Sequence, residues 1–271
     1  MKLEIVKRTF NYAVINKPSG LICAARGPNN IVDAVSEEFK QFLPTVSSSQ
    51  FRIVQRLDRF VTGGLLIARN KKWADKVRKS FYGGGNLKLI RRYVGLIPLT
   101  NIPKKTKGVI EHEIEALEKD YRGKHEPRKV LKYTAKTHYQ LLPALARKLE
   151  GDYPVFQQSQ VVPAIFQLET GRKNQIRDHV LQEFGVTLLN DDNFVDFKFN
   201  SEEPKNVNST IFKNNQIGLH SGLLIIENNG VSDEILFPVN EVNDRELWST
   251  FLNDNGEFIR PIRNALLNFD Y

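Results

Sequence analysis

Cysteine is almost absent from the 271-residue chain, in which Cys23 is the only one. A single thiol cannot form an intrachain disulfide, and the chain has no thiol-rich zinc motif. Cys23 lies in an apolar stretch, so we expect a small core residue rather than a nucleophile. The composition therefore fits a compartment that is reducing or indifferent to thiols.

Long hydrophobic runs are also absent. The longest apolar runs, such as residues 64–68, are far shorter than the roughly 20 residues needed to cross a bilayer. The first eight residues are basic but contain Glu4, lack a secretory hydrophobic segment and signal an organellar presequence only weakly. We therefore expect no membrane partner.

Motifs for metals and nucleotides are missing as well. The five histidines show no ligand spacing of the His-Glu-x-x-His type. The glycine triplet at 83–85 lacks the Gly-Lys-Ser/Thr ending of a phosphate-binding P-loop. We therefore expect no metal site.

The charge balance is uneven, with 39 Lys and Arg against 31 Asp and Glu, a net charge of +8 and a pI near 9.4. Such an excess favours a polyanionic partner, with nucleic acid ahead of an anionic membrane. A soluble protein that is basic for other reasons is the alternative. The hydrophobic fraction of 41% excludes wholesale disorder, and a chain of this length can form a substantial core.

Short apolar runs bounded by turn residues predict strands. They lie at residues 12–15, 65–67, 165–168, 223–226 and 234–237. Asn229-Gly230 between the last two predicts a hairpin. Apolar residues at helical spacing predict helices after the caps Asn30 and Asn70, over 176–184, and around Leu247 and Phe251.

Mixed strands and helices without a regular βαβ repeat favour an α+β fold. We expect one domain over residues 1–271. The polar, Asn-rich segment 200–216 is predicted to be a surface insertion, and segment 143–163, with its three prolines, to be irregular.

The first candidate site is residues 55–64, where Arg56 and Arg59 flank Asp58 and a glycine pair follows. Neighbouring cations favour the ionised form of a carboxylate, and an ionised Asp can act as nucleophile or base. The glycines permit unusual backbone angles or the close approach of a ligand. The alternative is a salt-bridged loop before a strand.

The second candidate site is residues 168–179, where a strand ends, a Thr-Gly turn follows and a basic helix begins. Cations and free N–H groups at a helix start suit a phosphate. Arg177 could hold a carboxylate from elsewhere in the chain through its planar fork. The alternative is a solvated helix face.

The third candidate site is residues 91–95, downstream of a basic stretch with interleaved aromatic residues. Basic residues can contact RNA phosphates while an aromatic ring stacks on a base. Trp73 and Phe81 share a helical stripe with Val77, so we expect them in the core. The lysines predicted to contact phosphate, unless they form an ordinary solvated face, are Lys71, Lys72, Lys76 and Lys79.

Five segments, taken in order, resemble the motifs of the RluA-type family of pseudouridine synthases. They are residues 16–21 (Asn-Lys-Pro-Ser-Gly-Leu), Arg56-Leu57-Asp58 with Thr62-Gly63, Arg92-Tyr93 with Gly95, residues 168–179, and Leu219-His220-Ser221. The family forms of the second and fourth are His-Arg-Leu-Asp-x-x-Thr-Ser-Gly and Leu-x-Thr-Gly-Arg-x-His-Gln-Ile-Arg-x-His. The resemblance runs from about residue 12 to about residue 238, nearly the whole chain.

The chain departs from the family pattern at four positions: Gln55 replaces His, Val61 replaces Thr, Thr62 replaces Ser and Asn174 replaces His. The family segment Gly-Asp-x-x-Tyr-Gly is degenerate at residues 190–194. These departures put rate and substrate choice in doubt. We expect no small S4 RNA-binding domain of the kind that many relatives carry, because few residues precede Tyr12.

The resemblance implies an isomerisation without a cofactor, in which the N1–C1′ bond of a uridine breaks and the uracil is rejoined through C5. Asp58 would be the nucleophile, on the ribose or on the base. Arg177 would hold the Asp58 carboxylate bidentately and keep it charged. Tyr93 would stack on the uracil and could help remove the C5 proton. Arg56 would assist in extruding the base.

The resemblance also implies a mixed, mostly antiparallel central sheet flanked by helices, with a central RNA-binding cleft. Arg172, Gln175 and Ile176 would contact the substrate there. The chain is most similar to the fungal mitochondrial enzymes that act on large-subunit rRNA. We therefore expect a monomer acting on rRNA in mitochondria; tRNA as substrate, and the cytoplasm or nucleus as compartment, stay open.

Two rival functions remain. One is an RNA-binding assembly factor that keeps the fold without chemistry, which the intact Asp58, Tyr93 and Arg177 disfavour. The other is a glycoside-type hydrolase using Asp58. Such an enzyme needs a second carboxylate as the acid, and the matched motifs contain none.

Overall fold

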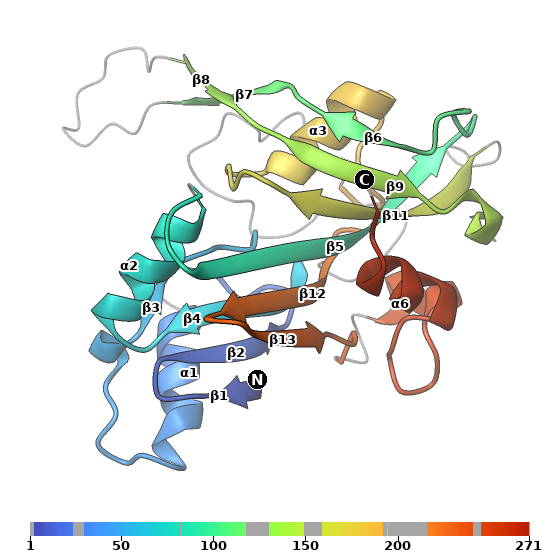
Figure 1. The fold of residues 1–271 in the computed structure, drawn as a ribbon. Helices are drawn as coiled ribbons and strands as arrows, with labels where there is room; N and C mark the ends of the chain where they lie inside the picture. Colours follow the sequence, from blue (N-terminus) through green and yellow to red (C-terminus); the bar gives the residue numbers. More distant parts are fainter. Residues whose placement is uncertain are drawn as a thin grey trace, which may run out of the picture.

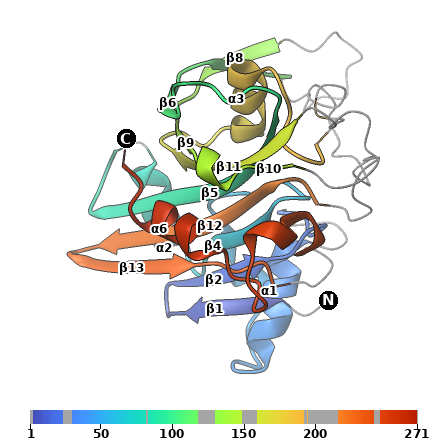
Figure 2. The same ribbon diagram turned by 90° about the vertical axis from the view of Figure 1, so that its right-hand side faces the viewer.

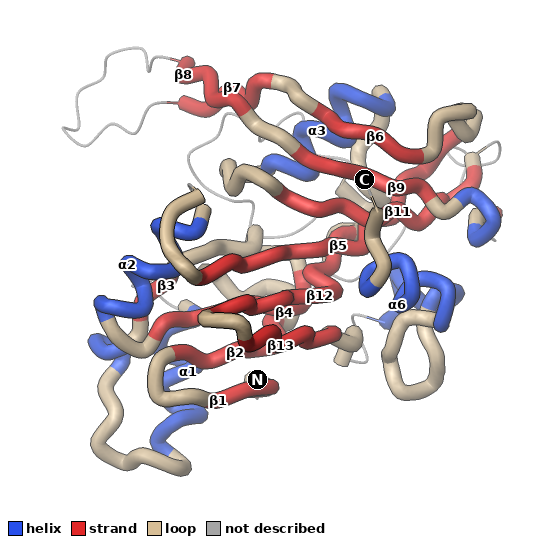
Figure 3. Tube along the Cα trace, in the orientation of Figure 1, coloured by secondary structure: helices blue, strands red, loops and turns tan. Residues whose placement is uncertain are grey.

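The chain forms a large central sheet and a second, separate sheet of two strands (Figures 1 and 3). The computed structural model describes residues 3–23, 30–81, 83–117, 130–148, 159–191, 194, 216–240 and 245–270. The smaller sheet pairs β7 (Glu113–Leu117) with β8 (Val130–Thr134).

The main sheet has eleven strands. Its order is β1 (Glu4–Arg8), β2 (Tyr12–Lys17), β4 (Thr62–Ala68), β12 (Leu219–Asn228), β5 (Leu87–Leu99), β11 (Gln160–Leu168), β9 (Thr137–Leu141) and β6 (Lys107–Ile110). Three further strands pair at the side of this path: β3 (Arg52–Ile53) with β4, β10 (Arg147–Lys148) with β11, and β13 (Val231–Leu236) with β12. Among the described strands only the β4–β12 pair is parallel, which confirms the predicted mixed, mostly antiparallel sheet.

The parallel contact between β4 and β12 depends on Gly63. Its φ is +103°, a backbone conformation that side-chain-bearing residues rarely adopt, and a Cβ added there would lie 2.3 Å from the carbonyl oxygen of Ser221. The two backbones can therefore approach only because residue 63 has no side chain. This approach brings the segment before β4 next to β12.

Local capping signals explain where the helices start. Asn30 accepts a hydrogen bond from Asp33 N at the start of α1 (Ile31–Lys40), and Asn70 accepts one from Trp73 N at the start of α2 (Lys71–Ser80). α3 (Gln175–Phe184) ends at Gly185, which has a positive φ. The predicted helices over these three regions are confirmed. Two short 3₁₀ helices, η1 (Ser48–Gln50) and η2 (Pro143–Leu145), lie in connections.

The helices cover both faces of the sheet (Figure 2). α1 and α3 pack into one core cluster together with Tyr93 of β5. On the opposite face, η3 (Glu246–Phe251) and α6 (Arg260–Leu267) pack against Val94 of β5 and Leu223 of β12. The face of β5 that carries Tyr93 therefore faces α1 and α3.

The helix predicted around Leu247 and Phe251 is present as a short 3₁₀ helix. One expectation for an irregular segment was wrong. Segment 143–163 is not wholly irregular, because η2, β10 and the start of β11 fall in it. Pro163 lies inside β11, and its carbonyl accepts a hydrogen bond from Leu142 N, just beyond the end of β9. The ladder between β9 and β11 begins at the next residue, so the N–H that proline lacks removes no hydrogen bond from that ladder.

The turn prediction at the end of β12 is confirmed. Asn229 and Gly230 have φ values of 51° and 80°, as a tight hairpin between β12 and β13 requires. The predicted insertion at 200–216 lies outside the described residues except for Gln216, so it stays a prediction.

Candidate active site

A buried lysine fixes the loop that carries Asp58. Lys17, at the end of β2, donates from its Nζ to the carbonyl oxygens of Pro18 at 2.9 Å, Arg59 at 2.9 Å and Val61 at 2.8 Å. An ammonium group has three N–H donors, and these contacts can use all of them. Sequence reasoning included Lys17 in a family motif but missed this bracing role, since spacing does not show which carbonyls a side chain reaches.

Arg177 holds two carboxylates at once. Its Nη1 donates to Oδ2 of Asp58 at 3.2 Å, while Nε and Nη2 donate to the two oxygens of Asp191 at 2.8 and 2.7 Å. The predicted pairing with Asp58 is confirmed, but the predicted bidentate geometry was wrong. The planar fork formed by Nε and Nη2 faces Asp191, and Asp58 accepts a single hydrogen bond, from Nη1.

The two carboxylates differ in exposure. The Asp191 side chain is 3% exposed, whereas that of Asp58 is 21% exposed at a pocket. Burial alone lowers the pKa of Arg177, but the charges of Asp191 and Asp58 outweigh it and raise that pKa, so the guanidinium stays charged. The geometry therefore makes Asp191 the anchor of Arg177 and leaves Asp58 accessible. Asp191 lies in residues 190–194, the segment that matches the family motif poorly. Its carboxylate was the only feature of the sequence there that could have indicated a partner for Arg177.

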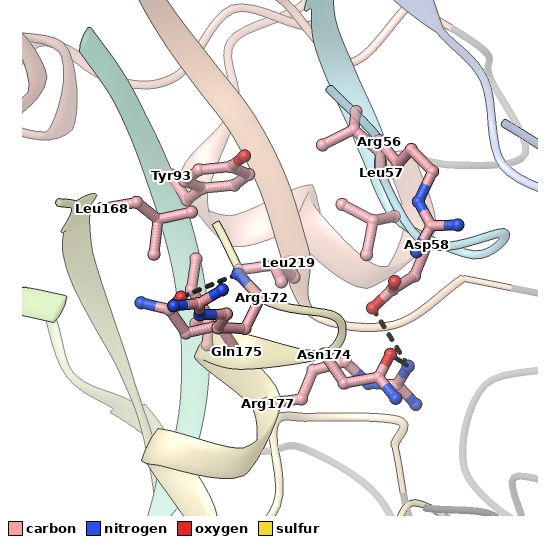
Figure 4. A pocket seen from close by; sticks show the side chains of 12 residues that line it. Arg56, Leu57, Asp58, Tyr93, Leu168, Arg172, Asn174, Gln175, Arg177 and Leu219 are labelled. Atoms are coloured by element: carbon pink, nitrogen blue, oxygen red, sulfur yellow. Dashed lines mark hydrogen bonds and ion pairs between the residues drawn. The ribbon is translucent and has the colours of Figure 1, made fainter. Parts of the chain in front are cut away.

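Tyr93 and Leu168 lie on one side of the pocket, and Asp58 and Arg177 lie on the other (Figure 4). Tyr93 is 5% exposed, and burial raises the pKa of its hydroxyl. Seven sequence-predicted residues line this pocket together: Arg56, Asp58, Tyr93, Arg172, Gln175, Ile176 and Arg177.

Gln175 lines the pocket, but protein groups engage its amide at both ends. Oε1 accepts from Thr170 Oγ1 at 2.8 Å and from Arg172 N at 3.0 Å. Nε2 donates to Lys136 O at 3.0 Å and Thr137 Oγ1 at 2.9 Å. We therefore interpret Gln175 as bracing the turn before α3, which carries Arg172 and leads to Arg177.

The four departures from the family pattern surround the site. Val61 and Asn174 line the pocket, and Gln55 lines an adjoining cavity. Asn174 has a left-handed φ of 57°, which Asn tolerates better than most residues, and its Oδ1 accepts from Arg177 Nη1 at 3.2 Å. Thr62 hydrogen-bonds the buried ring of His220. The substitutions therefore affect the groups that surround the reacting residues.

A larger cavity of about 440 Å³ adjoins the pocket and shares Asp58, Tyr93 and Arg172 with it. This volume is in the usual range for ligand sites. Arg78, Phe81, Arg91 and Lys173 also line it. Arg78 and Arg91 belong to the basic segment 69–92, which the family resemblance predicts to contact the RNA backbone, whereas Lys173 lies outside that segment. Phe81 was expected in the core and is instead partly buried at the cavity wall.

The four predicted lysines do not line either cavity in the described structure. Lys76 donates to Asn228 on the β12–β13 hairpin. Lys71, Lys72 and Lys79 are exposed on α2. Helical spacing predicts a basic face but does not show how that face is oriented toward a site elsewhere in the fold.

Within the part of the chain that the structure describes, no cluster of three His, Cys, Asp or Glu side chains could hold a metal ion. No described helix is long and apolar enough to cross a membrane.

The site combines an accessible carboxylate, a guanidinium that binds it, an aromatic side chain opposite and a cationic cavity wall. Such a set fits an enzyme that takes a base out of a polyanionic strand and uses a carboxylate on it. The sequence profile of the RNA pseudouridylate synthase family matches residues 11–182. The chain belongs to this family of isomerases.

Individual relatives agree with this assignment. The chain is 65% identical over 248 residues to the 21S rRNA pseudouridine(2819) synthase of Candida albicans, which covers 92% of this chain and 100% of the relative. It is 29% identical over 282 residues to the protein of the same name from Saccharomyces cerevisiae, covering 99% and 98%.

Solved structures show the same fold. Human RNA pseudouridylate synthase domain containing 4 superposes with a TM-score of 0.60 at 20% identity, over 90% of this chain and 92% of that one. Human RNA pseudouridylate synthase domain containing 1 gives a TM-score of 0.59 at 18% identity, over 98% and 95%. The predicted α+β pseudouridine synthase fold is confirmed.

Proposed function

We propose that this enzyme converts one uridine of mitochondrial large-subunit rRNA to pseudouridine, with Asp58 as the nucleophile. The observation that carries the catalytic part is the Asp58 carboxylate, exposed at the pocket and held there by Arg177. The RNA is proposed from the Candida albicans relative, whose name gives position 2819 of 21S rRNA. We expect the equivalent uridine to be the target.

The reaction requires only groups of this chain and the substrate. Asp58 attacks C1′ of the ribose or C6 of the uracil, and the N1–C1′ bond breaks. The uracil turns, a C5–C1′ bond forms, and the bond between Asp58 and C1′ or C6 breaks, which regenerates the free carboxylate. C5 loses its proton and N1 gains one. No atom is added or removed overall, so neither an oxidant nor a second substrate is needed.

The surrounding residues have separate roles in this proposal. Tyr93 stacks on the uracil, and its hydroxyl takes part in removing the C5 proton. Arg56, which lines both cavities, occupies the space that the extruded base leaves. Arg177 orients the Asp58 carboxylate through the hydrogen bond and ion pair from Nη1 to Oδ2.

The test is chemical mapping of pseudouridine in mitochondrial, cytoplasmic and transfer RNA from cells that lack this gene. We expect one mitochondrial large-subunit site to disappear, and to return with the wild-type gene but not with Asp58→Asn, which is nearly isosteric. Loss of a tRNA site alone would overturn the proposed substrate. Full rescue by Asp58→Asn would overturn the proposed nucleophile and favour an RNA-binding assembly factor.

A further inference from the structure

Arg91 is a buried arginine with no compensating carboxylate among the residues that the structure describes. It is 5% exposed, and its Nε has no hydrogen-bond partner among the described residues. Its Nη2 reaches the carbonyl of Thr170 only at 3.4 Å, and no carboxylate of the described chain lies within ion-pair distance. A buried charge with so little compensation destabilises a fold.

The neighbouring arginine shows what a structural arginine looks like in the same strand. Arg92 is also buried, but its Nε donates to Gln167 at 2.7 Å and its Nη1 donates to the carbonyl of Leu267 at 2.9 Å, at the end of α6. Arg92 therefore links two elements, whereas the protein provides few partners for Arg91.

Arg91 faces the catalytic side of the sheet. Residues 91 and 93 lie two apart on β5, so Arg91 and Tyr93 project from the same face. The Arg91 guanidinium carbon lies over the Phe81 ring, 4.6 Å from its centroid, in a cation–π contact. A Cβ added at Gly171 would lie 3.0 Å from Nη1, so a glycine at this position leaves room beside the fork.

The cavity wall around Arg91 is strongly cationic. Arg91 and four further cations line the cavity, against one carboxylate, that of Asp58. The four are Arg56, Arg78, Arg172 and Lys173. Asp58 is already paired with Arg177, and Arg78 is paired with Asp75. The other four cations of the wall therefore favour an anion.

We propose that Arg91 is a phosphate-binding residue, whose guanidinium holds one phosphodiester of the RNA strand next to the extruded uridine. The planar fork matches two non-bridging phosphate oxygens, and their charge compensates the buried cation. A neutral base edge would not supply that charge. This inference rests on the proposed function, because the cavity adjoins the pocket where the uridine would react.

The test combines protein variants with RNA in which single phosphates are neutral. The probe is a synthetic RNA containing the uridine mapped in the deletion strain, with a methylphosphonate placed at each flanking phosphate in turn. Equilibrium binding is measured for wild type, Arg91→Met and Arg91→Lys. Lys88→Met is the matched control, because Lys88 is an exposed cation on the same strand, an odd number of positions from Tyr93 and therefore on the other face.

We expect Arg91→Met to weaken binding roughly tenfold to a hundredfold, and Arg91→Lys to restore only part of it. The slope of log affinity against log salt should fall by about 0.7. A methylphosphonate at one flanking position should weaken wild-type binding as much as Arg91→Met does. The same methylphosphonate should not weaken the binding of Arg91→Met any further. Lys88→Met should bind like wild type. Arg91→Met should also melt no lower than wild type, because it removes a poorly compensated buried charge.

Three results would overturn the inference: unchanged binding by Arg91→Met, a melting temperature well below wild type, or additive losses from variant and methylphosphonate. If Arg91→Met fails to fold, the methylphosphonate series on wild type still tests the inference. If no single methylphosphonate weakens wild-type binding, the protein has no phosphate-binding site of this kind. If wild type binds this RNA without forming pseudouridine, the proposed function is contradicted. The binding measurements would still show whether Arg91 contacts a phosphate.

Discussion

Arg177 divides its hydrogen bonds between a carboxylate that stays buried and one that reaches the pocket. Two parallel bonds to Asp191 fix the guanidinium plane, and the single bond to Asp58 then fixes one carboxylate oxygen. A planar fork with several donors can do both at once, whereas an ammonium cannot. The charge of residue 177 is therefore less important than its shape.

Arg177→Lys should lower kcat by roughly a hundredfold, because a shift of about 1 Å in the reacting group can cost that much. The measurement is single-turnover pseudouridine formation beside equilibrium RNA binding, which should change little. Asp191→Asn, which weakens the anchor and leaves Asp58 intact, should slow the reaction in the same way. A lysine variant with wild-type turnover would reduce Arg177 to a general electrostatic contributor.

Tyr93→Phe separates stacking from proton transfer. The ring is retained, so RNA affinity should stay near wild type, whereas Tyr93→Ala should lose about 1–3 kcal/mol of stacking. The hydroxyl is absent in both, so product should form slowly in both. Single-turnover conversion and binding of both variants on one RNA check this. Wild-type turnover by Tyr93→Phe would leave Tyr93 as a stacking surface only.

At the scale of elements, local signals were reliable and long-range ones were not. The caps Asn30 and Asn70 and the hairpin residues Asn229 and Gly230 act on neighbours within a few positions, so the sequence predicts them directly. The contact between Arg177 and Asp191 depends on the path of the chain after α3, which periodicity does not describe. The motif resemblance brought Asp58, Tyr93 and Arg177 together, but not the residues that hold them.

Helix α2 carries exposed cations in two places, because Arg78 lines the cavity while Lys71, Lys72 and Lys79 do not. Reversing the three lysines to Glu should weaken RNA binding, provided that the RNA extends past the cavity. The slope of log affinity against log salt should become shallower by about 0.7 for each phosphate that the variant no longer neutralises. An unchanged slope would show that this face is only solvated.

At the scale of the whole molecule, stability should depend on a buried histidine in the centre of the sheet. Nε2 of His220 lies 3.1 Å from Phe237 O, which can only accept, so Nε2 carries the proton and Nδ1 accepts from Thr62 at 2.7 Å. Burial lowers the pKa of His220 to about 4. The imidazole therefore folds in its neutral form.

The unfolded chain, with a His pKa of about 6.5, binds more protons than the folded one below that pH. The free energy of unfolding should therefore fall as the pH drops from about 6.5 towards about 4, and this contribution should be constant above 6.5. Urea unfolding at pH 7 and pH 5 measures it, and His220→Gln should show a smaller difference. Burial lowers the pKa of His179 to about 4 as well, so part of the slope should remain.

The position of β12 determines how late in translation the central sheet can be completed. β4 and β5 leave the ribosome more than a hundred residues before β12, yet β12 lies between them in the sheet. Until it arrives, both strands have an unpaired edge, which is prone to pairing with other chains. The nascent chain must therefore be kept apart from its neighbours while most of its length is already made, and the catalytic pocket forms only near the end of translation.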